Sequence, residues 1–238
     1  MGHGWEGAVL KLLRAKDFKF TVTGAEQVTE HYRRLMFTDG GLLAELGIHP
    51  TMWVRLWFDN EGKPHQRGYT LVDPDRENGT FAIEFALHKG IACDWARTAE
   101  PGETIQATVY GTGFEQLDPA PERLLIVGDA ASLPAINSLI DAFPETPATI
   151  WFETAEEDDL PFRTDRERHD LRKIERGADG AALADQVRKE LPELVKDPAQ
   201  AYFWIAAEAK STRALTAFAR KELGIPKHRA HALAYWRA

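Results

Sequence analysis

The feature that most constrains the fold of this chain is a change of hydrophobic period between its two halves. Up to residue 111, the apolar side chains fall into short runs that are rich in β-branched and aromatic residues and are separated by turn clusters. The predicted strands are FKFTVTGAEQV (18–28), HYRRLMFT (31–38), TMWVRLWFD (51–59), QRGYTLVD (66–73), TFAIEFALH (80–88) and ETIQATVYG (103–111). Short strands at this spacing predict a small antiparallel barrel or sandwich.

From residue 123 onward, short apolar runs alternate with segments of helical period. The predicted strands are RLLIVGD (123–129), PATIWFE (147–153), HDLRKIE (169–175) and AYFWIAAE (201–208), and the predicted helices are SLPAINSLIDAF (132–143), DGAALADQVRKEL (179–191) and STRALTAFARKEL (211–223). This alternation predicts a parallel sheet with helical crossovers. Two prolines in LDPAPER (117–123) interrupt both patterns, so we predict a β-barrel domain at 1–118 and an α/β domain at 119–238.

Composition excludes several classes of protein. A net charge of −8 argues against nucleic-acid binding by bulk attraction, and the single cysteine, Cys93, excludes an internal disulfide. We expect a cytoplasmic protein, because the sequence has no secretory signal at its start and no apolar run as long as a membrane span. Residues 209–238 nevertheless hold seven Lys/Arg and one acid, Glu222, which suits either an anionic ligand or an ordinary solvated surface.

One predicted strand end carries a cation and a phenol together. Arg67 and Tyr69 in HQRGYTLVDP are two residues apart, so they share one face of the strand, and Thr70 lies on the other face. A guanidinium beside an aromatic ring suits a planar anionic ligand. A satisfied structural pair would look the same in the sequence, so both interpretations stay open here.

The stretch TFAIEFALHKGIACDWA has the elements of a phosphate site. Phe81, Ile83, Phe85 and Leu87 are predicted to face the core, and the opposite face carries Ala82, Glu84, Ala86 and His88. Gly90 permits a tight turn before a helix, and free N–H groups at a helix N-terminus attract anions. The alternative is an ordinary half-buried strand with an exposed histidine.

Two strand ends in the second half are candidate ligand positions, because open α/β sheets bind ligands there. Gly128 ends the first of these strands, with a helix opening at Ser132, and Glu208 ends another, with Lys210 and Arg213 nearby. The sequence lacks GxGxxG, GxSxG, HExxH and a Walker lysine. No carboxylate cluster accompanies the histidines near the C-terminus, so no metal site is predicted.

Several motifs occur in a family order: RGYT (67–70), IEFALHKG (83–90), LLIVGDAASLPAI (124–136), FWIAAEAKSTRAL (203–215) and HALAYWRA (231–238). A barrel followed by an α/β domain, with RxYT at a barrel strand end, resembles the ferredoxin-reductase superfamily. The ordered set resembles the siderophore-interacting protein family, which are flavin-dependent ferric-siderophore reductases. It looks most like the siderophore-interacting domain of mycobacterial mycobactin importers. The chain differs from the family pattern at Val72, where many members have Arg, and in KGIACD, which lacks Gly-Pro.

The resemblance implies specific site residues. Tyr69 would stack on the isoalloxazine ring, Arg67 would pair with the pyrophosphate and Thr70 would hydrogen-bond the flavin. The remaining FAD-binding residues implied by the family are Gly68, Glu84, Phe85, Ala86, Leu87, His88, Ala92, Cys93, Ala234, Tyr235 and Trp236. The NAD(P)H-binding residues implied in the same way are Gly128, Asp129, Ser132, Glu208, Lys210 and Arg213.

The resemblance also implies an activity: an FAD enzyme that takes hydride from NADPH, or NADH, and reduces Fe(III) held by a siderophore to Fe(II) in the cytoplasm. A mycobactin-like siderophore is one expected substrate. No metal ligand is implied in the protein, since the flavin carries the redox chemistry. Two alternatives remain open at this point. One is a non-catalytic siderophore-binding or regulatory module, favoured by the altered KGIACD loop, and the other is a general NAD(P)H:flavin reductase.

The first residues suggest a docking element. Trp5, Val9, Leu12 and Leu13 share an apolar face at helical spacing, with Lys11, Arg14 and Lys16 mostly away from it. A basic amphipathic stretch suits the inner face of an anionic membrane or an importer. The alternative is that the same apolar face packs on the barrel.

Overall fold

The computed structural model describes residues 15–154, 159–177 and 181–237. The chain separates into two compact units, residues 1–114 and 115–238. Within the described ranges, no helix is both long enough and apolar enough to cross a membrane. The amphipathic segment that precedes residue 15 lies outside the described residues.

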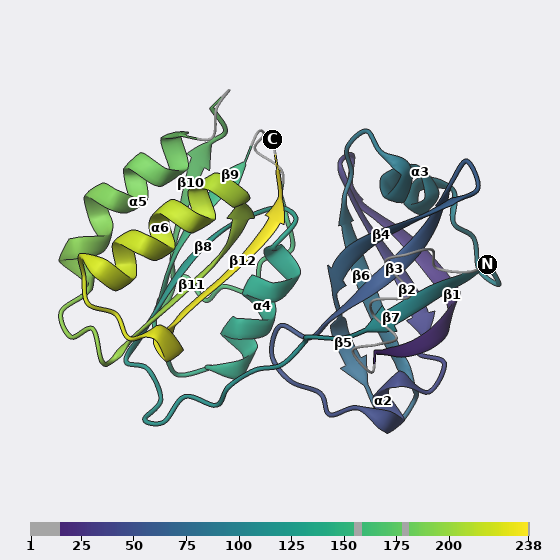
Figure 1. Cartoon of the computed structure of the whole chain (residues 1–238), viewed down its shortest axis with the longest axis horizontal. Coiled ribbons are helices and arrows are strands. Elements are labelled where there is room, and N and C mark those ends of the chain that lie inside the picture. The colour runs from purple at the N-terminus through teal and green to yellow at the C-terminus, as the bar shows by residue number, and fades with distance from the viewer. Residues whose placement is uncertain (1–14, 155–158, 178–180, 238) are drawn as a thin grey trace. The chain divides into compact units, whose positions relative to one another are not determined.

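The first unit is a half-barrel made of one antiparallel sheet (Figure 1). Its strands are β1 (Lys16–Thr29), β2 (Tyr32–Thr38), β3 (Trp53–Asn60), β4 (Lys63–Thr70), β5 (Val72–Asp75), β6 (Thr80–Ala86) and β7 (Thr104–Val109), and its helices are α2 (Leu42–Glu45) and α3 (Ile91–Thr98). The strand order is β4-β3-β7-β1-β2-β6-β5. The predicted antiparallel β domain is therefore confirmed.

The core of this unit follows from alternation along the strands. Phe20, Phe37 and Phe81, from three strands, are almost fully buried, and their ring centroids lie 4.9 to 6.3 Å apart. On β6 the predicted core residues Ile83 and Phe85 join the same cluster. Aromatic side chains bury large apolar areas, so this cluster dominates the packing of the half-barrel.

The predicted strand 66–73 is divided in the structure. β4 ends at Thr70 and β5 begins at Val72, which pairs with Ala82 of β6 instead of continuing along β3. The amide of Leu71 donates to the carbonyl of Met52 (2.8 Å), and Asp73 has a positive φ of 47°. The single predicted run therefore turns from one part of the sheet to another.

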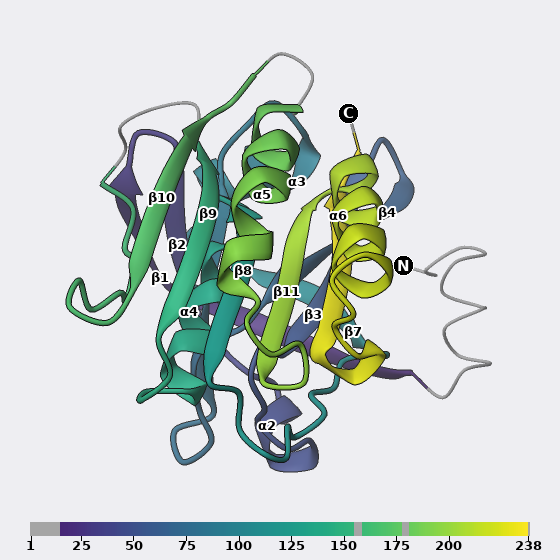
Figure 2. The same ribbon diagram turned by 90° about the vertical axis from the view of Figure 1, so that its left-hand side faces the viewer.

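The second unit is a parallel sheet with helices on both faces. Its strands are β8 (Arg123–Asp129), β9 (Ala148–Thr154), β10 (Asp170–Glu175), β11 (Ala201–Glu208) and β12 (Ala230–Trp236). Its helices are α4 (Leu133–Ala142), α5 (Ala181–Leu194), α6 (Ala209–Lys221) and the 3₁₀ turn η1 (Lys227–Arg229). The order is β10-β9-β8-β11-β12, all parallel. Figure 2 shows α5 and α6 on one face, and Figure 1 shows α4 on the other.

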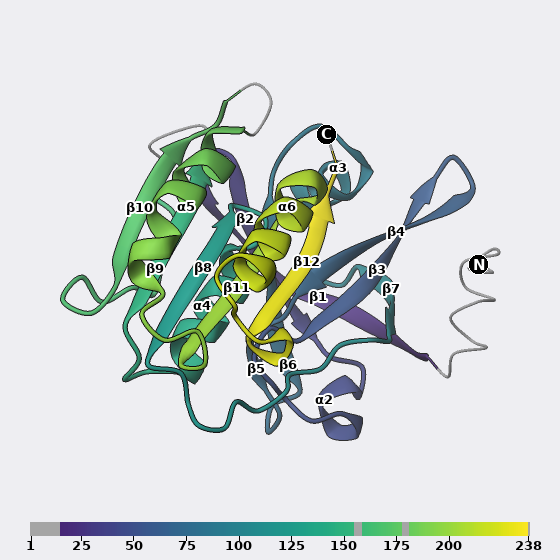
Figure 3. The same cartoon turned by 60° about the vertical axis from the view of Figure 1, so that its left-hand side comes forward.

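The order of the strands along the chain reverses direction between the neighbouring strands β8 and β11. The chain moves outward from β8 through β9 to β10 and then returns to start again at β11. Ligands of open α/β sheets bind at the carboxyl ends of the strands at such a point. The last strand, β12, lies beside β11 (Figure 3). It was not predicted from the sequence.

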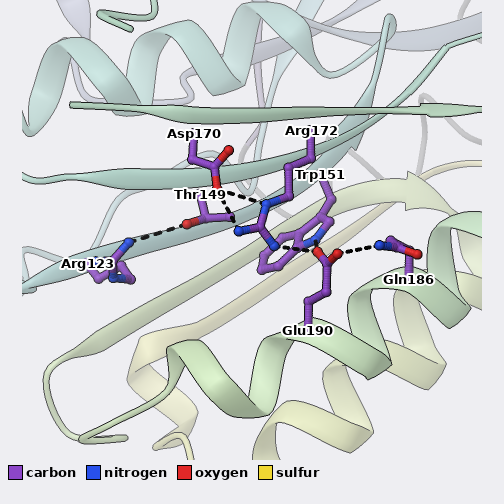
Figure 4. A network of polar contacts seen from close by, with 7 residues as sticks. All are labelled: Arg123, Thr149, Trp151, Asp170, Arg172, Gln186 and Glu190. Carbon is purple, nitrogen blue, oxygen red and sulfur yellow. Dashed lines mark hydrogen bonds and ion pairs between the residues drawn. The ribbon is translucent and has the colours of Figure 1, made fainter. Parts of the chain in front are cut away.

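A polar network fixes edge strand β10 and helix α5 to this sheet (Figure 4). The indole Nε1 of Trp151 on β9 donates to Glu190 Oε2 of α5 at 2.6 Å. Arg172 of β10 donates to the same Glu190 carboxylate and, at 2.6 to 2.8 Å, to Asp170. Gln186 donates to the other oxygen of Glu190. One carboxylate thus joins a buried indole, an edge strand and a helix.

Candidate functional site

Tyr69 and Arg67 lie near the end of β4, as the sequence predicts. The Tyr69 ring is half-buried, and its centroid lies 4.5 Å from that of Phe85 and 6.4 Å from that of Phe58. Burial raises the pKa of the Tyr69 phenol, Cys93 raises it further, and the charge of nearby Arg67 opposes this rise. The exposed Arg67 guanidinium donates to the carbonyl of Gln66 (2.8 Å). The guanidinium is thus near the ring without being bonded to it.

The neighbours of this pair on β4 have structural roles as well. Thr70 is buried, with 5% of its surface exposed, on the other face of the strand. A Cβ atom on Gly68 would lie 3.3 Å from the Trp53 ring of β3, so the glycine lets that indole pack closely against β4. Both residues stay candidates for flavin contact through this strand.

Glu84, a predicted flavin contact, is held by protein groups. Its carboxylate accepts a hydrogen bond from the Tyr32 hydroxyl (2.9 Å) and pairs with Arg34 Nε (3.3 Å). Arg34 also reaches Asp73 at 3.0 Å. Glu84 is 6% exposed, so these contacts satisfy a buried charge. Its role toward a cofactor remains a prediction.

The residues after β6 lead into helix α3. Phe85 is in the core, Ala86 and Leu87 are half-buried, and His88 is exposed with its ring Nδ1 2.9 Å from the carbonyl of Lys89. Gly90 has φ of 152°, a backbone conformation that residues with a side chain rarely adopt. The predicted glycine turn and helix start are confirmed.

The N-terminus of α3 offers backbone donors. The helix begins with Asp94 N donating to Gly90 O (2.8 Å), and no side chain caps it. Ala92 and Cys93 lie in the first turn, where backbone N–H groups lack helical partners. Their side chains are buried, and burial raises the pKa of the Cys93 thiol, which lies 3.5 Å from Ala86 O. Cys93 is therefore a core residue of low reactivity.

An aromatic layer joins the two predicted flavin elements. Trp95 of α3 lies 5.7 Å from Phe58 and 6.2 Å from Phe85, ring centroid to centroid. Both of those rings also contact Tyr69 of β4. The structure thus brings together the Tyr69 ring, the exposed Arg67 and the uncapped start of α3, all within the first unit.

In the second unit, Gly128, Asp129 and Ser132 form the turn from β8 to α4. A Cβ atom on Gly128 would lie 2.2 Å from Ser132 Oγ and 2.9 Å from Ile136 Cδ1, so the glycine permits close packing of the helix. Ser132 Oγ accepts from Asp129 N (2.8 Å) and donates to Asp129 O (2.9 Å). These bonds fix the start of α4 at the position that the sequence predicts.

Asp129 is a buried carboxylate. Its Oδ1 accepts from Ala131 N (3.0 Å) and its Oδ2 accepts from the Trp236 indole (2.6 Å). Burial raises its pKa above the ordinary value, while Trp236 and Arg176 act in the opposite direction. The structure therefore links a predicted nucleotide residue to a predicted flavin-covering residue inside one unit.

Glu208 caps helix α6. Its Oε2 accepts from Lys210 N (2.5 Å) and Ser211 N (3.0 Å), which fills that N-terminus with a carboxylate. The side chains of Lys210 and Arg213 are exposed on the same helix. Ala234, Tyr235 and Trp236 belong to β12, and Trp236 is the register neighbour of Glu208.

Two residues of this region were not predicted from the sequence. Glu153 is the last residue but one of β9, and Arg176 directly follows β10. Arg176 Nε donates to Glu153 Oε2 (3.1 Å), and its Nη2 lies 3.9 Å from Asp129 Oδ2. Both follow the rule that identified Gly128, a position at the carboxyl end of a parallel strand, so the same signal was available.

Comparisons with known proteins identify relatives of both units. Residues 121–238 match the family model described as "Siderophore-interacting protein", and residues 19–109 match "Siderophore-interacting FAD-binding domain". The chain is 34% identical over 248 residues to the mycobactin import ATP-binding/permease protein IrtA of Mycolicibacterium thermoresistibile, covering 99% of this chain and 26% of that protein. The chain spans about a quarter of the length of the curated relatives that it matches first.

Solved structures share the fold. The siderophore-interacting protein SipS of Aeromonas hydrophila has a TM-score of 0.78 at 22% identity, with 93% of this chain and 92% of that chain covered. A ferredoxin NADP+ reductase of Neisseria gonorrhoeae with bound FAD and NADP has a TM-score of 0.62 at 15% identity, with 83% and 88% covered. The chain therefore belongs to the siderophore-interacting protein family and has a ferredoxin-reductase-like fold.

Proposed function

We propose that this protein binds FAD and uses it to reduce Fe(III) held by a siderophore, with NADPH as the expected electron donor and NADH as the alternative. The observation that carries the proposal is the grouping of Tyr69, Arg67 and the uncapped N-terminus of α3 in the FAD-binding-domain region. FAD combines a flat ring with a pyrophosphate, so it needs both a stacking surface and an anion site.

The residues present fit such a cofactor. The Tyr69 ring is fixed by Phe85 and Phe58, so it offers a rigid surface for a flavin ring. The Arg67 guanidinium is exposed, and a guanidinium can donate two parallel hydrogen bonds to one phosphate group. Among the described residues, no side chain caps the N-terminus of α3 by a hydrogen bond, in contrast with α6, where Glu208 accepts the N–H bonds.

The division of work follows from these contacts. Bound FAD would supply the redox chemistry that links the two-electron hydride transfer from the donor to one-electron transfers to iron. Tyr69 orients the ring, Arg67 and the first amides of α3 hold the pyrophosphate, and the core behind them excludes water from one side of the ring. The iron is substrate, held by the siderophore, and Fe(II) leaves hard oxygen ligands more readily than Fe(III).

The donor and partner assignments rest on charge. Lys210 and Arg213 are exposed cations beside a strand end, which suits a 2′-phosphate or an anionic siderophore. The similarity to mycobactin importers supports a mycobactin-like substrate and contact with an importer or the inner membrane face from the cytoplasm. Each of these is part of the proposal.

Steady-state turnover tests the proposal. The purified full chain with bound FAD is mixed with NADPH and ferric carboxymycobactin, and Fe(II) is captured with ferrozine. We expect Fe(II) release well above that of free FAD at the same concentration. Bound FAD without Fe(II) release would favour a binding module, and equal rates with free flavin as acceptor would favour a general flavin reductase.

A further inference from the structure

Helix α3 packs on the half-barrel through one aromatic side chain. Trp95 is the only aromatic residue in the sequence of this helix, IACDWART. Its ring centroid lies 5.7 Å from that of Phe58 on β3 and 6.2 Å from that of Phe85 on β6. Both phenylalanine rings belong to the buried core of the first unit. Because aromatic side chains bury large apolar areas, the Trp95 ring fixes the helix to these two strands.

The same two core rings hold Tyr69 of β4. The Tyr69 centroid lies 4.5 Å from that of Phe85 and 6.4 Å from that of Phe58. Tyr69 and Trp95 therefore share a pair of ring neighbours, and we call these four residues the aromatic layer. Protein cores are packed as densely as organic crystals, so a change in one ring of the layer is felt by the others. The layer thus sets the position of α3 relative to the Tyr69 ring.

Polar contacts fix α3 to a different part of the chain. Arg97 Nη2 donates to the carbonyl of His88 at 3.0 Å, and Cys93 Sγ donates to the carbonyl of Ala86 at 3.5 Å. Both acceptors lie where β6 leads into the helix. The contact of Trp95 with Phe58 instead reaches β3, the strand that pairs with β4. Trp95 therefore links the helix to the part of the sheet that carries Tyr69.

The aromatic layer joins the two parts of the proposed FAD site. Tyr69 offers a surface for the flavin ring, and the first turn of α3 offers backbone N–H groups that lack helical partners. A ligand that engages two places gains affinity only when the distance between them matches its own span. FAD has both a ring and a pyrophosphate, so it depends on this distance. Riboflavin has the ring but no phosphate, so it depends on the Tyr69 surface alone.

We propose that Trp95 is a positioning residue that makes the site selective for FAD over flavins without a pyrophosphate. Through Phe58 and Phe85 it sets the distance between the Tyr69 ring and the N-terminus of α3, so that one FAD molecule reaches both. This inference rests on the proposed function, because it assumes that FAD binds at these two places. Trp95 acts through its neighbours, and the ring surface of Tyr69 stays available when the Trp95 ring is removed.

Removal of the Trp95 ring tests this role. Trp95→Leu keeps an apolar side chain but loses the ring contacts with both phenylalanines. Fluorescence titration of the full-chain apoprotein measures the Kd for FAD and the Kd for riboflavin. We expect Trp95→Leu to bind FAD about tenfold more weakly, the upper scale for losing an aromatic pair, and to bind riboflavin as the wild type does. Trp95→Phe restores a ring and should recover most of the FAD affinity.

A matched variant separates positioning from general stability. Phe37→Leu removes a ring from the same core, but this ring stacks on Phe81 and lies outside the aromatic layer. It should lower the thermal unfolding temperature and leave the ratio of the two Kd values unchanged. If Trp95→Leu does not fold, Trp95→Met fills more of the space with a flexible apolar chain and no ring. The same selective loss of FAD affinity is expected for it.

The outcomes distinguish this inference from the proposed function. An equal loss of affinity for FAD and riboflavin in the Trp95 variant, or unchanged affinity for both in a folded variant, overturns the positioning role. A wild-type apoprotein that binds no FAD overturns the proposed function itself. Reduction of ferric siderophore by the wild-type protein requires no Trp95 variant, so it tests the reductase proposal independently.

Discussion

The indole Nε1 of Trp236 donates a 2.6 Å hydrogen bond to Oδ2 of Asp129, which ties the last strand of the parallel sheet to its first. The acceptor is almost fully buried, and burial raises its pKa above the ordinary value for aspartate. The folded protein thus retains a proton at Asp129 over a pH range in which the unfolded chain has released it.

This relationship predicts how stability depends on pH. Because the folded pKa is raised, the contribution of Asp129 to the free energy of unfolding is complete below the unfolded pKa, about 3.9. It is lost as pH rises through the folded pKa. Asp129→Asn should therefore lack this loss, so its stability relative to the wild type should improve from acid to neutral pH. Urea unfolding at a series of pH values measures the difference. Asp185→Asn, an exposed site on α5, is the control, and the same pH trend in both variants would contradict the assignment.

The flavin site predicts a specific loss on removing one cation. Arg67→Ala should weaken FAD binding by about 1.5–3 kcal/mol, the range for a hydrogen bond to a charged group. Fluorescence titration of the apoprotein with FAD measures the Kd. Arg76→Ala removes another exposed arginine of the same unit and should have no comparable effect. A folded Arg67→Ala protein with wild-type FAD affinity would remove Arg67 from the site.

The Glu190 network predicts the opposite pH dependence. Partial burial alone would raise the pKa of Glu190, but the donors Trp151, Arg172 and Gln186 together hold it below the ordinary value. The stabilisation is therefore present above the unfolded pKa and is lost as pH falls through the folded pKa. Glu190→Gln should cost about 1–2 kcal/mol at neutral pH and less in acid.

Urea unfolding of Glu190→Gln at neutral and acid pH checks this prediction. Glu193→Gln, an exposed carboxylate on the same helix, is the matched control. A cost for Glu190→Gln that stays the same at both pH values would show that the charge of Glu190 contributes nothing to stability.

The choice of donor depends on two exposed cations of α6. If Lys210 and Arg213 contact a 2′-phosphate, the double variant Lys210→Gln/Arg213→Gln should lose about tenfold in kcat/KM with NADPH and little with NADH. Steady-state kinetics with both donors measures the ratio, and Lys221→Gln, at the other end of α6, is the control. An equal loss with both donors would place these residues outside the 2′-phosphate contact.

The sequence predicts the fold well because local periodicity determines most elements. Alternation along β6 identifies Ile83 and Phe85 as core residues, and the α4 start at Ser132 follows from a strand, a glycine turn and a helical period. The division of 66–73 into β4 and β5 was not predicted, because it depends on the bond from Leu71 to Met52 across the sheet.

The site was predicted less completely, for a physical reason. Arg67 and Tyr69 lie two residues apart on one strand, so a local motif is sufficient to predict that they are neighbours. The pairing of Asp129 with Trp236, and of Glu153 with Arg176, joins residues from separate strands. Glu84 and Glu208, which the sequence predicts as ligand contacts, also have partners within the protein: a buried ion pair for one and a helix cap for the other. Residue type alone does not distinguish these roles.

A single-turnover reduction tests the central claim most directly. The full chain with bound FAD is reduced anaerobically with dithionite, freed of excess reductant and mixed with ferric carboxymycobactin and ferrozine. We predict that the visible absorbance of oxidised flavin returns in step with formation of the Fe(II)–ferrozine complex, with faster kinetics than for free reduced FAD. A protein that binds FAD but remains reduced, with no Fe(II) formed, would contradict the account of this chain as a ferric-siderophore reductase.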